Sequence, residues 1–160
     1  MNRPIDKVAV RFELNGECVE REIPARQLLV DFIRDDLGLT ATRVGCEQGV
    51  CGSCTVMLDG VSVRSCLMFA VQVNGCVVRT VEGLADGATM HPLQQAFWDN
   101  HALQCGFCTS GFLMTALDLI EHQAESGEKA VRNALSGNLC RCTGYANIVA
   151  AVQSALAGKR

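Results

Sequence analysis

The sequence has no long apolar run and no marked surplus of charge of one sign. Residues Met1 to Lys7 contain no apolar core of the kind that a secretion signal needs, and the apolar runs elsewhere are too short to span a bilayer. The net charge of −3 offers no basic surface for gripping phosphates. We therefore expect a cytoplasmic protein with no membrane span and no nucleic-acid partner.

The sequence also lacks the residue patterns of substrate chemistry. It shows no nucleophile with a base in a triad pattern, no glycine-rich phosphate-binding loop and no carboxylate pair beside a suitable partner. None of its three histidines shares a ligand pair with a cysteine. We expect a chain without catalytic residues of its own.

Cysteine, in contrast, is abundant, with ten in 160 residues. Reductants in the cytoplasm keep thiols reduced, so metal ligation explains this number better than a disulfide framework. Two of the ten, Cys18 and Cys76, stand apart from the others in expected strands. We expect these two to be small core hydrophobes without a functional role.

The first set of four cysteines occupies a glycine-rich loop and the end of the hairpin after it: Cys46, Cys51, Cys54 and Cys66. The spacing is that of plant-type ferredoxins, in which three ligands of a 2Fe-2S cluster come from one loop and the fourth from elsewhere. Gly45, Gly49 and Gly52 would let the backbone turn tightly around the cluster. A structural zinc site usually has two short Cys-x2-Cys pairs and fits this spacing poorly.

The second set joins a Cys-x2-Cys pair to a Cys-x-Cys pair: Cys105, Cys108, Cys140 and Cys142. Helical patterns between the two pairs could fold back and bring them together. Spacing alone is compatible with zinc as well as with an iron-sulfur cluster. Two adjacent clusters make electron transfer the more economical explanation, so we expect a second 2Fe-2S cluster. A zinc-stapled interaction module stays the alternative.

The order of the elements predicts an α+β fold of two domains. Two hairpins with turns at Asn15-Gly16 and Asp59-Gly60, a helix between them and a last strand from Cys76 to Val81 predict a β-grasp, plant-type ferredoxin-like domain over residues 1–83. The later periodic segments all have helical spacing, so residues 84–160 are expected to form a four-helix bundle. The first three helices are expected to begin at Pro92, near Thr109 and after a cap at Ser126, and Ile148, Val149, Val152 and Leu156 mark the fourth.

Three runs closely resemble the small iron-sulfur subunit of the molybdenum hydroxylases, the xanthine oxidase family: GCEQGVCGSCT (45–55), QCGFCT (104–109) and GNLCRCTGY (137–145). The resemblance covers nearly the whole chain. It implies an electron-transfer subunit of an oxidoreductase complex, in which electrons pass from molybdenum through two 2Fe-2S clusters to FAD. Many relatives have proline where this chain has Ser110.

The resemblance also implies partners and cofactor contacts. A large subunit would hold molybdopterin cytosine dinucleotide and a medium subunit FAD, in a dimer of heterotrimers. The first set of cysteines would ligate the cluster nearer the flavin, and the second set the cluster nearer molybdenum. Gln104 and the sulfur of Cys142 would contact the pterin. A free ferredoxin-like electron shuttle is the alternative, and the substrate stays open among carbon monoxide, a purine, another nitrogen heteroaromatic and an aldehyde.

Overall fold

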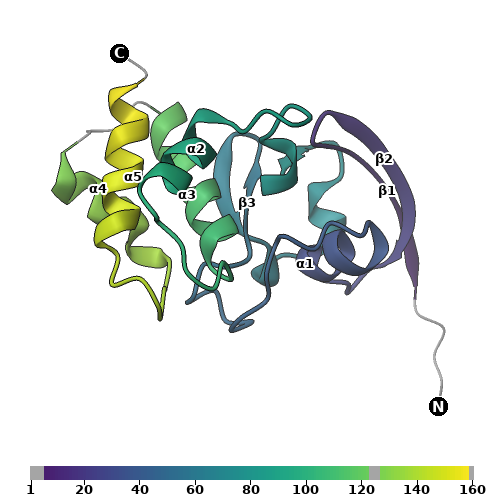
Figure 1. Cartoon of the computed structure of the whole chain (residues 1–160). Helices are drawn as coiled ribbons and strands as arrows, with labels where there is room; N and C mark the ends of the chain where they lie inside the picture. The colour runs from purple at the N-terminus through teal and green to yellow at the C-terminus, as the bar shows by residue number, and fades with distance from the viewer. Residues whose placement is uncertain (1–5, 123–126, 159–160) are drawn as a thin grey trace.

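The structure is a computed structural model that describes residues 6–122 and 127–158. A five-stranded sheet forms the N-terminal part and helices form the C-terminal part, and the two lie side by side (Figure 1). The prediction of a sheet followed by helices is confirmed: the protein has a mixed architecture of one five-stranded sheet and helices.

The sheet is built from two hairpins and a central strand. In chain order its strands are β1 (Lys7–Leu14), β2 (Glu17–Pro24), β3 (Thr55–Leu58), β4 (Val61–Arg64) and β5 (Val77–Arg79). They are arranged in the order β2-β1-β5-β3-β4, and only the β1 and β5 pair is parallel. Both predicted turns are present, because Asn15 and Asp59 have φ of 52° and 47° and each precedes a glycine with positive φ. Two residues of positive φ are what a type I′ hairpin turn requires.

The helix after the first hairpin changes its hydrogen-bond spacing part-way. The α-helical part, α1 (Leu29–Asp31), passes directly into a π-helical turn, Phe32–Asp36. Gly38 follows with φ of +72°, the left-handed conformation predicted for the residue that ends this helix. The segment fills the core beneath the sheet with its buried side chains: Leu29, Phe32 and Ile33.

Three single 3-10 turns lie next to the strands of the second half of the sheet. They are Ser65–Leu67, Ala70–Val73 and Val81–Gly83. The first of these turns carries Cys66, directly after β4. The last strand of the sheet is shorter than predicted, since it ends at Arg79 and the chain enters the third turn after Thr80.

The described residues of the C-terminal part form four α-helices and a 3-10 turn: α2 (Pro92–Asp99), α3 (Thr109–Glu121), α4 (Glu128–Ala134), Leu135–Gly137 and α5 (Ala146–Ala157). Pro92 opens α2 and Thr109 opens α3, as predicted. The predicted cap Ser126 lies outside the described residues, and α4 starts after Gly127. None of the helices within residues 6–122 and 127–158 is long and apolar enough to cross a membrane.

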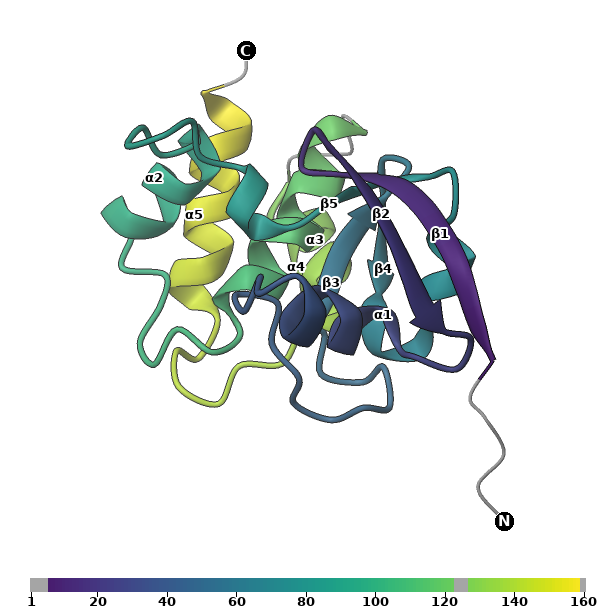
Figure 2. The same ribbon diagram turned by 90° about the vertical axis from the view of Figure 1, so that its right-hand side faces the viewer.

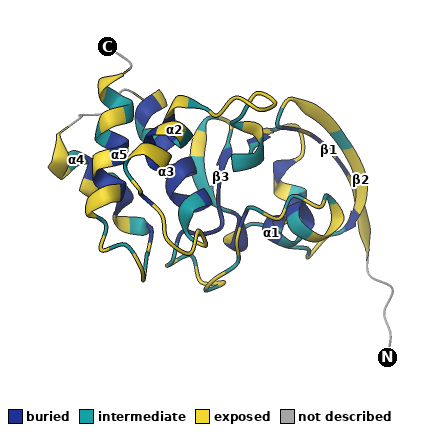
Figure 3. Cartoon of the chain, viewed as in Figure 1, coloured by how far each residue is buried: buried dark blue, intermediate teal, exposed yellow. Residues whose placement is uncertain are grey.

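Helix α3 packs against the sheet on one side and against the other helices on the other. It lies against β3 in both orthogonal views (Figures 1 and 2), and Met57 of β3 belongs to the same apolar core as Phe112 and Met114 of α3. Figure 3 shows the buried residues gathered along α3 and between the sheet and α1. A helix that is apolar on almost every side is expected where both flanks are covered.

Candidate iron-sulfur centres

The segments that carry the predicted ligands meet at one end of the molecule. In Figures 1 and 2 the loop before β3, the loop before α3 and the loop before α5 all lie at the lower end. The first and third of these loops are joined directly, because the amide of Leu139 donates to the carbonyl oxygen of Cys51 at 2.9 Å. Residues far apart in the sequence are thus neighbours around the thiols.

In the first set, hydrogen bonds join Cys46 to Cys51 and Cys54 to Cys66, and an electrostatic interaction also joins Cys54 to Cys51. The sulfur of Cys46 accepts hydrogen bonds from the amides of Gln48 and Cys51, each at 3.4 Å. These bonds stabilise the thiolate and lower the pKa of Cys46 to about 7. Cys54 is buried, and burial raises its pKa to about 11. A bound metal is needed to hold Cys54 as a thiolate near neutral pH.

The second set shows the same division into pairs. The sulfurs of Cys105 and Cys142 lie 3.6 Å apart, and Cys108 interacts with Cys140. Burial raises the pKa of Cys108 to about 12. Burial acts in the same direction on Cys140, but hydrogen bonds from the hydroxyl and the amide of Thr143, at 3.1 and 3.4 Å, bring its pKa below the ordinary value.

This pairing bears on the kind of metal site that the thiols form. Within the described parts of the chain, no three side chains of His, Cys, Asp or Glu converge closely enough to hold a single metal ion. A zinc ion needs its ligands gathered tetrahedrally around one point, whereas a two-iron cluster shares four thiolates between two irons. The close pairs of thiols, two in each set, can be shared between two irons as a two-iron cluster requires.

The glycines of the first loop have the role that the sequence predicted. Gly49 and Gly52 have φ of +74° and +75°, which side chains rarely adopt. A Cβ at Gly45 would lie 3.2 Å from the sulfur of Cys51 and 3.4 Å from the ring of Phe107. The loop can close on the thiols only without these side chains.

One buried polar atom near the second set also fits a bound group. The hydroxyl oxygen of Ser110, two residues after Cys108, is buried and has no hydrogen-bond partner among the described residues. A buried hydroxyl without a partner is costly, so native proteins rarely leave one unsatisfied. A cluster held by Cys108 would bring sulfur acceptors to this part of the chain.

Gln104 lies beside the exposed pair of the second set. Its side chain is exposed, as are Cys105 and Cys142, and it makes no hydrogen bond to any residue that the structure describes. The amide therefore keeps one donor group and one acceptor oxygen available for a partner that docks at this end.

The two remaining cysteines differ from each other. Cys76 is half-buried against the core of the sheet, as predicted. The prediction for Cys18 is wrong, because Cys18 is exposed. It lies on β2, an edge strand of the sheet, and the neighbouring residue Val19 is the one that packs against the core.

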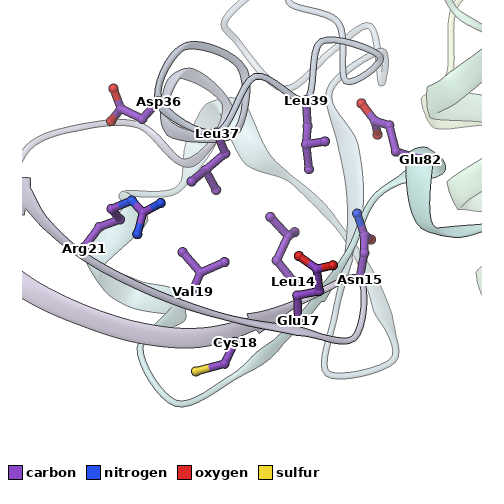
Figure 4. Close-up of a pocket in the computed structure, with 10 residues that line it drawn as sticks. All are labelled: Leu14, Asn15, Glu17, Cys18, Val19, Arg21, Asp36, Leu37, Leu39 and Glu82. Carbon is purple, nitrogen blue, oxygen red and sulfur yellow. The ribbon is translucent and has the colours of Figure 1, made fainter.

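A pocket of about 470 Å³ lies between the first hairpin and the end of the π-helical turn, on the sheet side of the molecule (Figure 4). Asp36 and Glu82 line it, but both carboxylates hold structural hydrogen bonds: Asp36 with Gln27, and Glu82 with the amide of Ala41 and the hydroxyl of Thr80.

Sequence reasoning missed two residues that support the second set. Thr143 donates twice to Cys140, and the hydroxyl oxygen of Tyr145 accepts a hydrogen bond from the amide of Cys140 at 3.0 Å. A hydroxyl residue three positions after a cysteine was the available signal for Thr143. Tyr145 has φ of 70°, a conformation that no side-chain pattern indicates.

Family models match the chain in two adjoining stretches. A "2Fe-2S iron-sulfur cluster binding domain" matches residues 12–80, and a "[2Fe-2S] binding domain" matches residues 80–153. The zinc alternative is therefore set aside for both sets of cysteines. Caffeine dehydrogenase subunit gamma from Pseudomonas sp. strain CBB1 is 53% identical over 148 residues, which cover 91% of this chain and 89% of that protein. The chain is an iron-sulfur small subunit of the molybdenum hydroxylase family.

Other small subunits agree with this assignment. The nicotine 6-hydroxylase small subunit of Paenarthrobacter nicotinovorans is 53% identical over 152 residues, covering 95% of this chain and 92% of that one. In the crystal structure of quinoline 2-oxidoreductase from Pseudomonas putida 86, the matching chain is 47% identical and superposes with a TM-score of 0.89 over 96% of this chain and 97% of that chain. The predicted role of iron-sulfur electron carrier in an oxidoreductase complex is confirmed, in preference to a free shuttle.

Proposed function

We propose that this small subunit carries electrons from a molybdopterin-binding large subunit to an FAD-binding medium subunit. The observation that carries the proposal is the direct contact of the two loops that carry the thiol sets, through the hydrogen bond from the amide of Leu139 to the carbonyl of Cys51, in a chain of this family. Each 2Fe-2S cluster, when bound, supplies a site that accepts and releases an electron.

We assign each cluster one set of thiols, with two thiols to each iron. The first cluster takes Cys46, Cys51, Cys54 and Cys66, and the second takes Cys105, Cys108, Cys140 and Cys142. The contacts within each set support this assignment. The family matches meet at residue 80, which supports a boundary near residues 83 and 84 between the two proposed cluster-binding domains. The helices α2 to α5 would act as the four-helix bundle of the second.

The chain's own groups stabilise the thiolates from the protein side. Amides of the first loop donate to Cys46, and Thr143 donates to Cys140. Cys108 is the residue that caps the start of α3, a helix of 13 residues, so the positive end of the helix dipole faces the second set. Such donors and dipoles favour the negative charge of thiolates and tune the potential of what they hold.

The exposure of two cysteines of the second set supports the proposed direction of electron transfer. Cys105 and Cys142 reach the surface beside Gln104, whereas Cys54 and Cys66 are buried. We assign Gln104 and Cys142 to contacts with the pterin of the cofactor, which would be molybdopterin cytosine dinucleotide on the large subunit. The second cluster would then be nearer molybdenum and the first nearer the flavin.

The names of the relatives narrow the proposed substrate. Caffeine dehydrogenase, nicotine 6-hydroxylase and quinoline 2-oxidoreductase are named for nitrogen heteroaromatic compounds, and each shares about half of its small-subunit residues with this chain. We propose a nitrogen heteroaromatic substrate, oxidised on the large subunit. All ten cysteines are free thiols, which suits the proposed cytoplasmic location.

Purification of the native complex tests this function. We expect the chain to co-elute with two larger subunits, in a complex whose mass fits a dimer of heterotrimers, with molybdenum and FAD present. Electron paramagnetic resonance after reduction should show two distinct cluster signals, and nitrogen heteroaromatics should bleach the visible absorbance. A chain that elutes alone, or that contains zinc in place of iron, would contradict the proposal.

A further inference from the structure

Asn138 is a buried polar residue at the contact between the two cluster-binding loops. Its side chain is 1% exposed. The side-chain amide donates to the carbonyl oxygen of Gly52 at 3.2 Å, and the side-chain oxygen accepts from the hydroxyl of Thr115 at 3.0 Å. Both ends of this side chain are therefore engaged, one on the first loop and one on α3.

The position of these contacts relates them to both sets of thiols. Gly52 directly follows Cys51, and Asn138 precedes Cys140 by two residues. The neighbouring amide of Leu139 donates to Cys51. Two consecutive residues of the segment before Cys140 thus hold two consecutive carbonyl groups of the first loop.

The backbones approach so closely that only glycine fits between them. A Cβ at Gly52 would lie 2.5 Å from the carbonyl oxygen of Gly137 and 2.6 Å from the amide of Asn138, and a Cβ at Gly111 would collide with the carbonyl of Gly52. Arg64 reinforces the contact from the other side, because its guanidinium donates to Gly137 at 2.8 Å. The contact is therefore tight on both sides of Gly52.

The hydrogen bond from Asn138 is not needed to satisfy the Gly52 carbonyl. That oxygen already accepts from the amide and the hydroxyl of Thr55, at 3.2 and 2.5 Å. What Asn138 adds is a link between segments that are 86 residues apart. Removing the link leaves the Gly52 carbonyl satisfied by Thr55, and the hydroxyl of Thr115 loses its acceptor. The loss therefore acts on how the first loop is held against α3 and the segment before Cys140, and not on the Gly52 carbonyl itself.

We propose that Asn138 is a positioning residue that fixes the distance and orientation between the two clusters. It does so by holding the first loop against the segment that carries Cys140. This inference rests on the proposed electron-carrying function, because the rate of electron passage between two centres falls steeply with their separation. Its role is therefore in electron transfer between the clusters and not in binding either of them.

The test is Asn138→Leu in the assembled complex, since leucine has the same branching at Cγ but no hydrogen-bonding group. After reduction with dithionite, the magnetic interaction between the two clusters is measured from the splitting and relaxation of their paramagnetic resonance signals. We expect the defined interaction of the unchanged complex to be lost, while each cluster keeps its own signal and its iron. An unchanged interaction would overturn the role of Asn138.

A second variant and a control complete the test. Asn138→Ser keeps a polar group but cannot reach Gly52, so it should lose the interaction as well, and it decides the question if Asn138→Leu fails to assemble. Asn74→Ala removes an asparagine oxygen that accepts from the amide of Arg11 at the far side of the sheet, and it should leave the interaction unchanged. If the unchanged complex lacks two cluster signals, the proposed function fails. If the unchanged complex shows both cluster signals and the Asn138 variants keep the same magnetic interaction between them, the inference on Asn138 fails while the proposed function stands.

Discussion

The hydroxyl of Ser62 on β4 donates to the carboxylate of Asp118 on α3 at 2.5 Å, and the amide of Ser62 donates to the same oxygen at 3.0 Å. These two bonds fasten the sheet to α3 at the end opposite the thiols. Because Asp118 is half-buried and charged, we expect Asp118→Ala to destabilise the protein by about 1.5–3 kcal/mol. Thermal unfolding monitored by circular dichroism measures this, with Asp86→Ala as a control on an exposed turn. Equal unfolding temperatures for the two variants would show that the bonds do not contribute.

The contact between Asp118 and His122 predicts that the stability of the fold depends on pH. Hydrogen bonding of His122 to the backbone carbonyl of Asp118 raises the pKa of His122 above its ordinary value of 6.5, and the Asp118 carboxylate acts in the same direction. A raised pKa means that the charged histidine stabilises the fold at pH below about 6.5, and that this contribution is lost as the pH rises through the higher folded value. We expect the difference in unfolding temperature between the unchanged protein and His122→Gln to shrink over that range. A difference that grows with pH would contradict the sign.

Comparing alanine substitutions at Gly52 and Gly16 distinguishes the cost of backbone strain from the cost of steric overlap. Both have positive φ, but a Cβ at Gly16 would meet nothing within 4 Å, whereas one at Gly52 would press on Gly137 and Asn138. Gly16→Ala should cost only the conformational strain, about 1 kcal/mol. Gly52→Ala should add about 1–3 kcal/mol of overpacking and reduce the iron content of the first cluster. Similar stability and iron content in the two variants would contradict the close approach.

Cys51→Ser tests the division of the thiols into two sets. The contacts among thiols run within each set, so loss of one ligand from the first cluster should leave the second in place. Paramagnetic resonance of the reduced complex should show one signal instead of two. Loss of both signals from a folded protein would mean that the ligands are wrongly divided.

Gln104→Ala tests the proposed contact with the pterin. Without the side-chain amide, polar groups of the buried cofactor would lose a partner, at a cost of about 1–3 kcal/mol. We expect slower bleaching of the clusters by substrate, or lower molybdenum content, with unchanged cluster spectra. Gln95→Ala, on the exposed face of α2, is the matched control. Normal bleaching and full molybdenum occupancy in Gln104→Ala would refute the contact.

The parts of the structure that the sequence predicted depend on local signals. The dipeptides Asn15-Gly16 and Asp59-Gly60 have the conformations that two-residue hairpin turns need, and the strands follow from them. Cysteine spacing indicated the two sets because ligands within a short loop must be close in sequence. Local spacing also indicated the apolar face of the helix at Leu29, but not its change to π-helical hydrogen bonds, since both forms bury the same face.

The parts that could not be predicted depend on contacts between distant segments. Asn138 faces Gly52 only because α3 brings the two loops together, and Ser62 meets Asp118 for the same reason. Cys18 was misjudged because an isolated cysteine in a strand gives no sign of which side of the sheet it is on, or that the strand is at an edge.

The pairing of Gly52 with Gly111 also constrains how such proteins can be recombined. A chimera that takes the sheet from one relative and the helices from another inherits one glycine from each parent. The first loop can approach the helices this closely only when both positions lack a Cβ, because a Cβ at Gly111 would meet Gly52 and a Cβ at Gly52 would meet Gly137 and Asn138. Exchange of these two segments keeps this contact only between parents that both have glycine at these positions. Where one parent has a larger residue, the helices will dock at a distance from the first loop and the joined protein will hold its centres apart.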